Sequence, residues 1–384
     1  MDLKEVVQVM EQLAPLSLAE PWDNVGLLVE PSKCRPVKTV LLTNDLTPAV
    51  MEEAEAMGCD LIVSYHPPLF RPVKRLVQKD WKQRLAVRAI ESGIAIFSPH
   101  TSWDSVKGGV NDWLVGGLGS GQVCVLSQAL STSSGHKLEF TVRSLEELDA
   151  VMEDLKSCNS GAGLQHSSCS ADGCGIQVSV TCSDSALGPS VQALSRHNAP
   201  SSSLKVVKLE APPLLGHGQG RLSILDDPVT VETAIQKTKT HLGLTHLRLA
   251  LGVGKTLDSS ISTVAVCAGS GASVLSGVKA DLYITGRSSE VHIRQHKIST
   301  IPQLPVFSEP DCYFISDHLN HFPGEMSHHE VLDAVAKGTS VILCDHSNSE
   351  RGFLSVFRER LTVRLPDSVA VVVSKVDRDP LEVV

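Results

Sequence analysis

The alternation of short apolar runs with helical stretches constrains the fold of this chain more than any other feature. Residues 39–43, 60–65 and 94–97 are rich in Val, Leu and Ile and have the pattern of strands. Helical patterns at residues 48–57 and 82–91 lie between them. Strands that alternate with helices predict a parallel sheet with right-handed crossovers. We therefore expect an α/β protein.

A change in composition near residue 130, towards Ser, Gly and Thr, indicates a second kind of domain. Residues 135–212 show the order strand, helix, strand, strand, helix, strand, which is the βαββαβ order of a ferredoxin-like unit. The α/β rhythm returns after it. We expect a first α/β lobe at 1–130, an inserted ferredoxin-like domain at 135–212 and a second α/β lobe at 213–384, with mainly parallel sheets in the lobes.

Residues 287–323 do not fit this rhythm. They show no clean period and contain Pro302, Pro305, Pro310 and Pro323. A loop this long without structure of its own is uncommon inside a compact domain. We expect a disordered insertion, and we keep open that it is a translated retained intron. Sequencing the transcript separates the two.

The charge balance and the apolar runs exclude some classes of function. The net charge is -9, whereas a broad nucleic-acid surface needs clustered Lys and Arg. No apolar run reaches the ~18 residues of a membrane span, and the charged start, Met1 to Glu5, lacks an apolar signal core. We therefore expect no direct nucleic-acid binding and no membrane span. Localisation is expected in the cytoplasm, with the nucleus left open.

Residues of metal-ligand type stand at several of the predicted strand ends. In parallel sheets, ligands bind beyond the carboxyl ends of the strands. His66 ends one strand, His100 and Asp104 follow another, and His346 and Glu350 follow a third. Imidazole nitrogens and carboxylate oxygens suit zinc, iron or manganese. This placement predicts a site for one or two divalent ions.

Each of these residues also has a purely structural alternative. His66 also fits the close of a strand before Pro67, and Asp104 fits a turn or helix cap. Ser347 to Glu350 has the Ser-x-x-Glu spacing of a capping box, in which the carboxylate bonds to the backbone rather than to a metal. Only their shared position at strand ends favours the metal site.

Seven motifs, in this order along nearly the whole chain, resemble those of the NIF-three-like family, and the animal members are the most similar. They are Trp22–Leu27, Ser64–Pro68, Ser98–Asp104, Ala268–Gly271, Asp281–Gly286, Gly324–His329 and His346–Gly352. The resemblance implies a two-lobed α/β fold with a dinuclear metal centre between the lobes, assembly into homo-oligomeric rings and, in some members, an inserted ferredoxin-like domain.

The resemblance also implies which residues hold the metal. Its ligands correspond to His66, Asp104, His346 and Glu350. Many bacterial members have a second His next to the first of these, where this chain has Tyr65. A phenol with a pKa of ~10 is a poorer ligand at neutral pH than imidazole, which bears on the occupancy of a second metal.

Two functions follow from the resemblance. The first is a metal-containing protein-interaction partner, a corepressor or cofactor of transcription found in cytoplasm and nucleus. The alternative is a metal-dependent hydrolase of a nucleotide-like or phosphoester substrate, as the family's label of GTP cyclohydrolase I type 2 homologue implies. In that alternative His100, His328 or His329 would transfer protons.

Overall fold

The protein divides into two compact units, one made of residues 1–127 and 216–384 and the other of residues 128–215. A computed structural model describes residues 1–32, 36–131, 135–158, 165–171, 175–286 and 326–381. The expected insertion at 287–323 lies outside these residues. Each unit has its own hydrophobic core.

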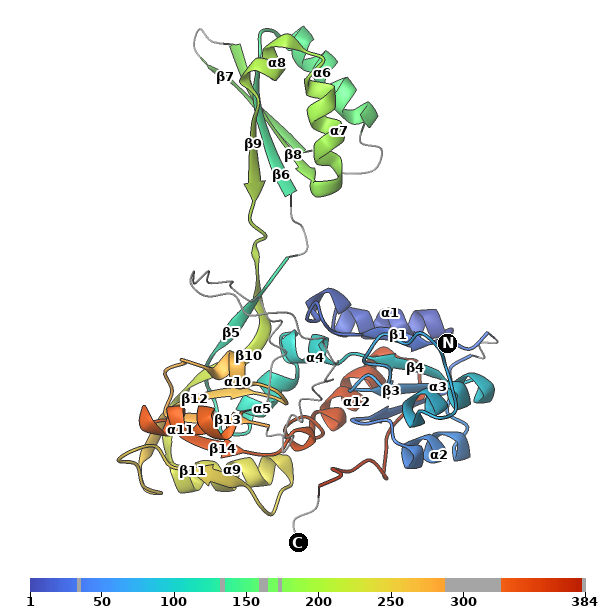
Figure 1. Ribbon diagram of the computed structural model, residues 1–384, viewed down its shortest axis with the longest axis vertical. Helices are drawn as coiled ribbons and strands as arrows, with labels where there is room; N and C mark the ends of the chain where they lie inside the picture. The colour runs from blue at the N-terminus through green and yellow to red at the C-terminus, as the bar shows by residue number, and fades with distance from the viewer. Residues whose placement is uncertain (33–35, 132–134, 159–164, 172–174, 287–325, 382–384) are drawn as a thin grey trace, which may run out of the picture. The chain divides into compact units, whose positions relative to one another are not determined.

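The first sheet of the larger unit is mainly parallel (Figure 1). Its strands, in spatial order, are β1 (Gly26–Val29), β4 (Ala95–Ser98), β3 (Leu61–Ser64), β2 (Thr39–Thr43) and β15 (Ala370–Val373). Only the β1–β4 pair is antiparallel. The helical elements of this part are α1 (Leu3–Leu13), η1 (Leu16–Leu18), α2 (Pro48–Ala56), α3 (Trp81–Ser92) and α12 (Phe353–Arg364).

Local sequence accounts for these elements. All four residues of β3 are buried, as expected for an apolar strand covered on both faces of a parallel sheet. Helix α3 begins after Asp80, whose carboxylate accepts the Gln83 N–H at 3.0 Å, and ends at Gly93, which has φ 71°. An acceptor at the N-cap and a left-handed Gly after the last turn are the preferred helix ends.

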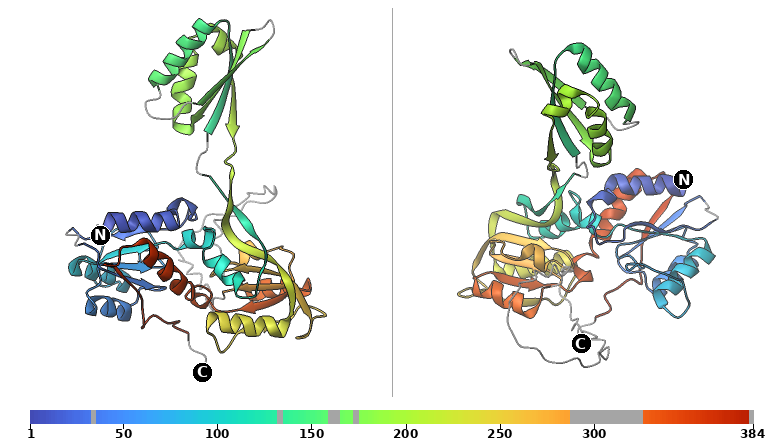
Figure 2. Two further views of the ribbon diagram at one scale, coloured as in Figure 1. Left: turned by 180° about the vertical axis from the view of Figure 1, so that it is seen from behind. Right: turned by 45° about the horizontal axis from the view of Figure 1, so that its top comes forward.

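The second sheet of this unit is mixed, and Figure 2 shows both sheets from two further directions. Its strands, in spatial order, are β11 (Arg248–Ala250), β14 (Ser340–Leu343), β13 (Leu282–Thr285), β12 (Ser260–Cys267), β10 (Pro213–Thr230) and β5 (Gly121–Leu130). The three central strands, β14, β13 and β12, run parallel. The remaining helical elements of the unit are α4 (Thr101–Ser105), α5 (Val110–Gly116), α9 (Val231–Leu242), α10 (Ala272–Leu275), α11 (His328–Ala336) and η2 (Ser347–Ser349).

The C-terminal elements differ from the expected division of the chain. Residues 213–384 were expected to form the second lobe, but β15 pairs with β2 of the first sheet, from Ala370 opposite Thr39 to Val373 opposite Leu42. Helix α12 packs against β2 and β15. A short apolar strand such as Ala370–Val373 matches the edge of either sheet, so its pattern does not tell which sheet it joins.

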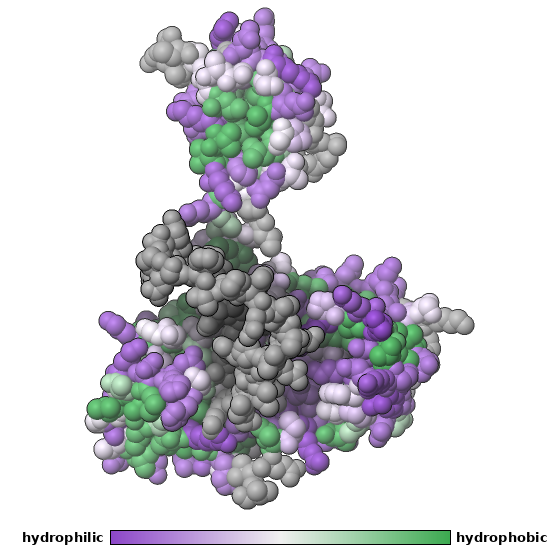
Figure 3. Space-filling view, in the orientation of Figure 1, coloured by the Kyte–Doolittle hydropathy of each residue, from purple (hydrophilic) through white to green (hydrophobic). Residues whose placement is uncertain are grey.

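The smaller unit has the predicted ferredoxin-like order. Its elements are β6 (Gly135–Val142), α6 (Leu145–Cys158), β7 (Gln165–Ala171), β8 (Gly175–Ser183), α7 (Asp184–Leu194), α8 (Asn198–Ser203) and β9 (Lys205–Leu209). The sheet order is β7-β8-β6-β9 with antiparallel pairs. The core lies between this sheet and α6 and α7, and hydrophobic residues also gather on the face of the unit seen in Figure 3. Among the described residues, no helix has both the length and the apolar character to cross a bilayer.

Replacing Gly243 by alanine is expected to lower the free energy of unfolding by about 1 kcal/mol. Gly243 ends α9 with φ 67°, and no atom lies within 4 Å of the position a Cβ would take. The cost is therefore one of backbone conformation rather than of collision. Urea denaturation followed by circular dichroism measures it.

Gly116 provides the matched control. It also has open space around its Cβ position, but it lies in α5 without a positive φ. Gly116→Ala is expected to raise stability by about 0.5–1 kcal/mol, because alanine loses less backbone entropy in a helix. A loss of stability in both variants would contradict the conformational explanation.

Candidate metal centre

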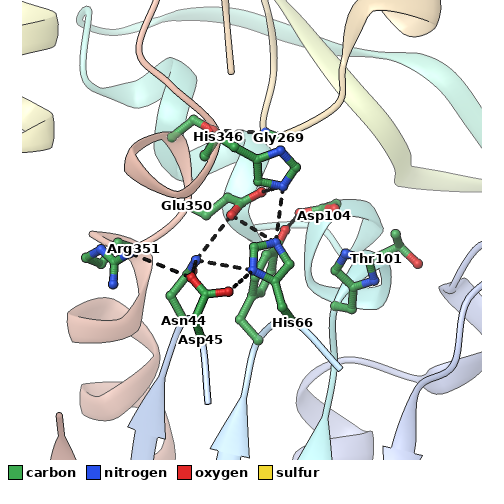
Figure 4. A network of polar contacts seen from close by, with 12 residues as sticks. Asn44, Asp45, His66, Thr101, Asp104, Gly269, His346, Glu350 and Arg351 are labelled. Carbon is green, nitrogen blue, oxygen red and sulfur yellow. Dashed lines mark hydrogen bonds and ion pairs between the residues drawn. The ribbon is translucent and has the colours of Figure 1, made fainter. Parts of the chain in front are cut away.

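The loops that follow strands of the two sheets in the larger unit meet at one place. Asn44 and Asp45 follow β2, His66 follows β3, and His346 follows β14 of the second sheet. Figure 4 shows these side chains facing one another, with Glu350 beside His346. The carboxyl ends of parallel strands are where α/β proteins place ligands, and here two sheets contribute to one site.

Three side chains bring potential ligand atoms together. The Nε2 atoms of His66 and His346 lie 3.2 Å apart. Glu350 Oε2 lies 3.3 Å from His66 Nε2, and Glu350 Oε1 lies 3.3 Å from His346 Nε2. The ligand atoms of the three residues all lie within 4.8 Å of one another. The structure thus joins three of the four predicted ligands in one cluster.

The chemistry of this cluster fits a divalent cation. Two imidazole nitrogens and a carboxylate oxygen are the donor set that zinc, iron and manganese accept. The Glu350 side chain is only 2% exposed, so its charge needs a partner close by. Gly269, with φ 55°, leaves room at the cluster, because a Cβ there would come within 2.4 Å of Glu350 Oε1 and 3.1 Å of His346 Nε2. His66, His346 and Glu350 are therefore the residues that would hold an ion.

Asp45 orients the His66 ring. Its Oδ1 lies 2.9 Å from His66 Nδ1, which leaves Nε2 directed at His346 and Glu350. A carboxylate on the second ring nitrogen is the usual support of a metal-binding histidine, because it sets the tautomer and the ring angle. The sequence analysis did not identify Asp45 in this role. The feature that could have indicated it is that Asp45 follows β2, the strand that pairs with the strand before His66.

Replacing Asp45 by asparagine is expected to weaken divalent-metal affinity about 10- to 100-fold. Asparagine keeps the size of the side chain but removes the charge that holds His66 Nδ1. Competition with a chromophoric chelator measures the dissociation constant. Asp258→Asn, at an exposed position of the same unit, is the control and is expected to leave it unchanged. Equal losses in both variants would contradict the orienting role.

Asp104 lines the same pocket but does not belong to the three-residue cluster. Its Oδ1 accepts a hydrogen bond from the Tyr65 hydroxyl at 2.6 Å, and both side chains are buried. Burial raises the pKa of Asp104 to about 8, and the nearby charge of Glu350 acts in the same direction. Burial, with the charge of Asp104 next to it, also raises the pKa of the Tyr65 phenol. Tyr65 therefore serves here as a hydrogen-bond donor to Asp104.

His100 forms a pair with Asp23 beside the cluster. Its Nδ1 lies 2.7 Å from Asp23 Oδ1, while Asp23 Oδ2 accepts the N–H and hydroxyl of Thr101. Burial lowers the pKa of His100, and the positive charge of His66 adds to the effect, so the ring is neutral near pH 7. His100 has φ 34°, a backbone conformation that costs about 1–3 kcal/mol and is typical of functional sites. Asp23 was not recognised from the sequence as a partner of His100.

Further polar residues link the segments that follow strands of the first sheet with those that follow β14 of the second. The Arg351 Nη1 atom lies 2.5 Å from Asp377 Oδ1, and its Nη2 lies 3.8 Å from Asp45 Oδ2. Asp377 Oδ2 accepts the Asn44 N–H at 2.8 Å, and the Asn44 side chain donates to Glu350 Oε2 at 3.4 Å. None of these contacts was predicted, because they join residues up to 333 positions apart in the sequence.

The charges in the cluster depend on one another. Burial of His66 opposes its protonation, but Glu350 and Asp45 outweigh this and raise the pKa of His66 to about 10. Burial alone would raise the pKa of Glu350, yet His346 and His66 hold it below its ordinary value. Without a metal ion, a proton on His66 thus supplies the positive charge that the buried carboxylate requires.

The structure does not bring every predicted residue to this site. His328 and His329 are exposed at the start of α11, and neither lines the pocket around the cluster. The capping box of that helix joins Ser327 and Glu330, which leaves both histidines outside the bonded cap. By contrast, the capping box expected at Ser347–Glu350 is not formed, because the Glu350 carboxylate faces the histidines.

A pocket of about 860 Å³ surrounds the cluster. Its wall combines aromatic side chains, Trp22 and Phe70, with the polar groups of Asp104, His100 and Lys82. A volume of this size accommodates a small organic molecule. The three residues that could hold an ion therefore line a pocket of this size.

Comparison with known proteins assigns the chain to a family. The profile of Duf34/NIF3 (NGG1p interacting factor 3) matches residues 1–304 and 321–380. This chain belongs to the NIF3 family. The NIF3 profile skips residues 305–320, which lie within the stretch where the sequence predicts an insertion.

NIF3 relatives match along nearly their whole length. The rat NIF3-like protein 1 is 44% identical over 389 residues, with 100% of this chain and 93% of the relative covered. NGG1-interacting factor 3 of Saccharomyces cerevisiae is 29% identical over 392 residues, covering 99% and 96%. The structure of Staphylococcus aureus protein SA1388 matches with a TM-score of 0.70 at 20% identity. The structure of a Bacillus cereus protein related to NIF3 matches with a TM-score of 0.62 at 21% identity. Each match covers 100% of this chain and 99% of the similar chain. These structures support the α/β NIF3 fold.

Proposed function

We propose that this NIF3-family protein binds a divalent metal ion through His66, His346 and Glu350 and acts by binding a protein partner. The observation that carries the metal site is the convergence of three ligand atoms within 4.8 Å. The interaction role is supported by the yeast relative, which is named as an interactor of NGG1. The ion would join the two lobes, because His66 comes from the first sheet and His346 from the second.

The test measures metal and partner together. Elemental analysis of the purified full-length protein is expected to give a bound divalent metal in stoichiometric amount. Calorimetry with recombinant NGG1, or with the corresponding protein from the same organism as this chain, is expected to show binding that a chelator abolishes. Binding that is unchanged by complete metal removal would overturn the link between metal and partner, and absence of binding in both states would overturn the interaction role.

A second candidate is a metal-dependent hydrolase of a nucleotide-like or phosphoester substrate. The observation that favours it is the pocket of about 860 Å³ around the cluster, which contains the His100–Asp23 pair. A bound divalent ion would supply Lewis-acid polarisation and activation of water. His100, held at Nδ1 by Asp23, is suited to transfer a proton at this pocket.

Turnover experiments separate this candidate from the first. Nucleotides and phosphoesters are incubated with the metal-loaded protein, with and without chelator. A hydrolase requires turnover that is lost on chelation and reduced by about 10²–10⁴-fold in His100→Gln. Turnover that survives both changes would exclude this assignment.

A further inference from the structure

An exposed loop beside the pocket has features that neither the metal site nor the core uses. It belongs to the long connection between β3 and α3, residues 65–80, which has no regular secondary structure. Loops of this length in compact domains usually carry a function. Every residue from Arg71 to Lys82 is exposed, and we call residues 71–82, which include the first two residues of α3, the basic loop.

The basic loop is positive in a negative protein. It contains five basic residues and one acidic residue, whereas the whole chain has a net charge of -9. The acidic residue, Asp80, is already used as the N-cap of α3. The basic residues have no carboxylate partner among the residues that the structure describes; they are Arg71, Lys74, Arg75, Lys79 and Lys82.

Large apolar side chains lie exposed among these charges. The exposed fractions are 40% for Val73, 47% for Leu76, 39% for Val77 and 43% for Trp81. The Lys82 Nζ atom lies 5.5 Å from the centre of the Trp81 ring. Exposed apolar side chains that alternate with basic residues, with Trp and Arg present, have the composition of a protein-binding surface.

Hydrogen bonds hold the basic loop in place. The Val77 N–H donates to Gln83 Oε1 at 2.9 Å, and Arg84 Nη1 donates to the Gln78 carbonyl at 3.2 Å. Both contacts anchor the loop to the first turn of α3. A surface that is already ordered loses less conformational entropy on binding. The loop also borders the metal pocket, because Lys82 and the adjacent Phe70 line it.

We propose that the basic loop is a docking surface for an acidic peptide segment that carries apolar side chains. Carboxylates of such a segment would pair with the five basic residues of the loop, and its apolar side chains would cover Val73, Leu76, Val77 and Trp81. Arginine favours carboxylates because its planar guanidinium binds them through two parallel hydrogen bonds. This inference rests on the protein-interaction role proposed above and names the surface and the chemistry of the partner.

Charge favours a peptide over the two other anionic partners. Nucleic acids and anionic membranes present extended negative surfaces, which the rest of a chain with net charge -9 would repel. Pro72 and the irregular backbone also prevent the continuous amphipathic helix that lies on membranes. A short acidic segment contacts only the loop and avoids this repulsion.

Fluorescence anisotropy with the full-length protein tests the proposal. The probe is a short labelled peptide in which Asp and Glu alternate with Leu and Phe. We expect saturable binding that weakens as salt rises, and at least about tenfold weaker binding in the double variant Arg71→Glu, Arg75→Glu and in Trp81→Ala. The matched control is Lys205→Glu, Lys208→Glu, an exposed pair on β9, which is expected to leave binding unchanged.

The outcomes distinguish this surface from the proposed function. Peptide binding that is equal in the loop variants and the wild type, or that is absent, would overturn the surface. Preferential binding of single-stranded DNA or of phosphatidylserine vesicles would overturn the partner class. Binding of NGG1 or its counterpart is measured on the same variants. If both loop variants still bind NGG1, the proposed surface is wrong but the interaction role stands. If the wild-type protein does not bind NGG1, the interaction role itself is wrong.

Discussion

Replacing Glu350 by glutamine is expected to weaken divalent-metal binding by more than about 100-fold. This is a larger loss than the one expected for Asp45→Asn, because Glu350 is itself a proposed ligand. The glutamine side chain keeps the shape but removes the only carboxylate in the His66–His346–Glu350 cluster. An ion at this cluster would lose a ligand and the negative charge of the Glu350 side chain, which is only 2% exposed. Chelator competition and elemental analysis measure the loss.

The control for Glu350→Gln is Glu359→Gln. Glu359 lies in α12 close to Glu350 in sequence, but it is exposed and outside the cluster. Circular dichroism on both variants checks that the fold is kept. Full metal content and unchanged metal affinity in Glu350→Gln would contradict the assignment of the metal site. This conclusion does not depend on the partner or substrate.

Metal affinity is expected to rise about 100-fold between pH 6 and pH 8, which is about tenfold per pH unit. An ion binds the neutral imidazole, whereas the pKa of His66 in the metal-free protein is raised to about 10. The ion must therefore displace a proton throughout this range, and its affinity grows until the pH approaches about 10. Chelator competition across pH, corrected for protonation of the chelator, measures the slope.

The same pKa predicts the opposite trend for the metal-free protein. A raised folded-state pKa contributes stability that is fully present below the unfolded value of about 6.5 and is lost as pH rises through about 10. The metal-free protein is therefore expected to lose stability progressively between about pH 6.5 and pH 10. His136, which pairs with Asp184 in the smaller unit at 3.1 Å, supplies the control, since His136→Gln should not alter the pH slope of metal affinity. A flat affinity profile above pH 6 would contradict proton displacement.

Most of the fold follows from local patterns. The strand-helix alternation near the N-terminus predicts the parallel part of the first sheet, and the βαββαβ order predicts the smaller unit. What the patterns do not indicate is the place of β15, because Ala370–Val373 is apolar throughout and could pair with any exposed sheet edge. Its pairing with β2 depends on the position of α12, which is a tertiary contact.

The candidate site was only partly visible in the sequence. His66, His346 and Glu350 stand at strand ends, where ligand residues are expected, and they do come together. Asp45 shares that position, but a carboxylate after a strand is common and does not show which histidine it supports. Asp377 lies in an irregular segment after the last strand, so no periodicity or motif connects it with Arg351.

The sequence by itself determined the class of fold, the two kinds of domain and the residue types available for a metal, because these depend on periodicity and composition over neighbouring residues. The tertiary structure decided which of those residues meet. Glu350 is a capping residue or a metal ligand depending on whether His66, 284 positions earlier, lies beside it. Only the meeting of the loops that follow β3 in the first sheet and β14 in the second brings that histidine to 3.3 Å from its carboxylate.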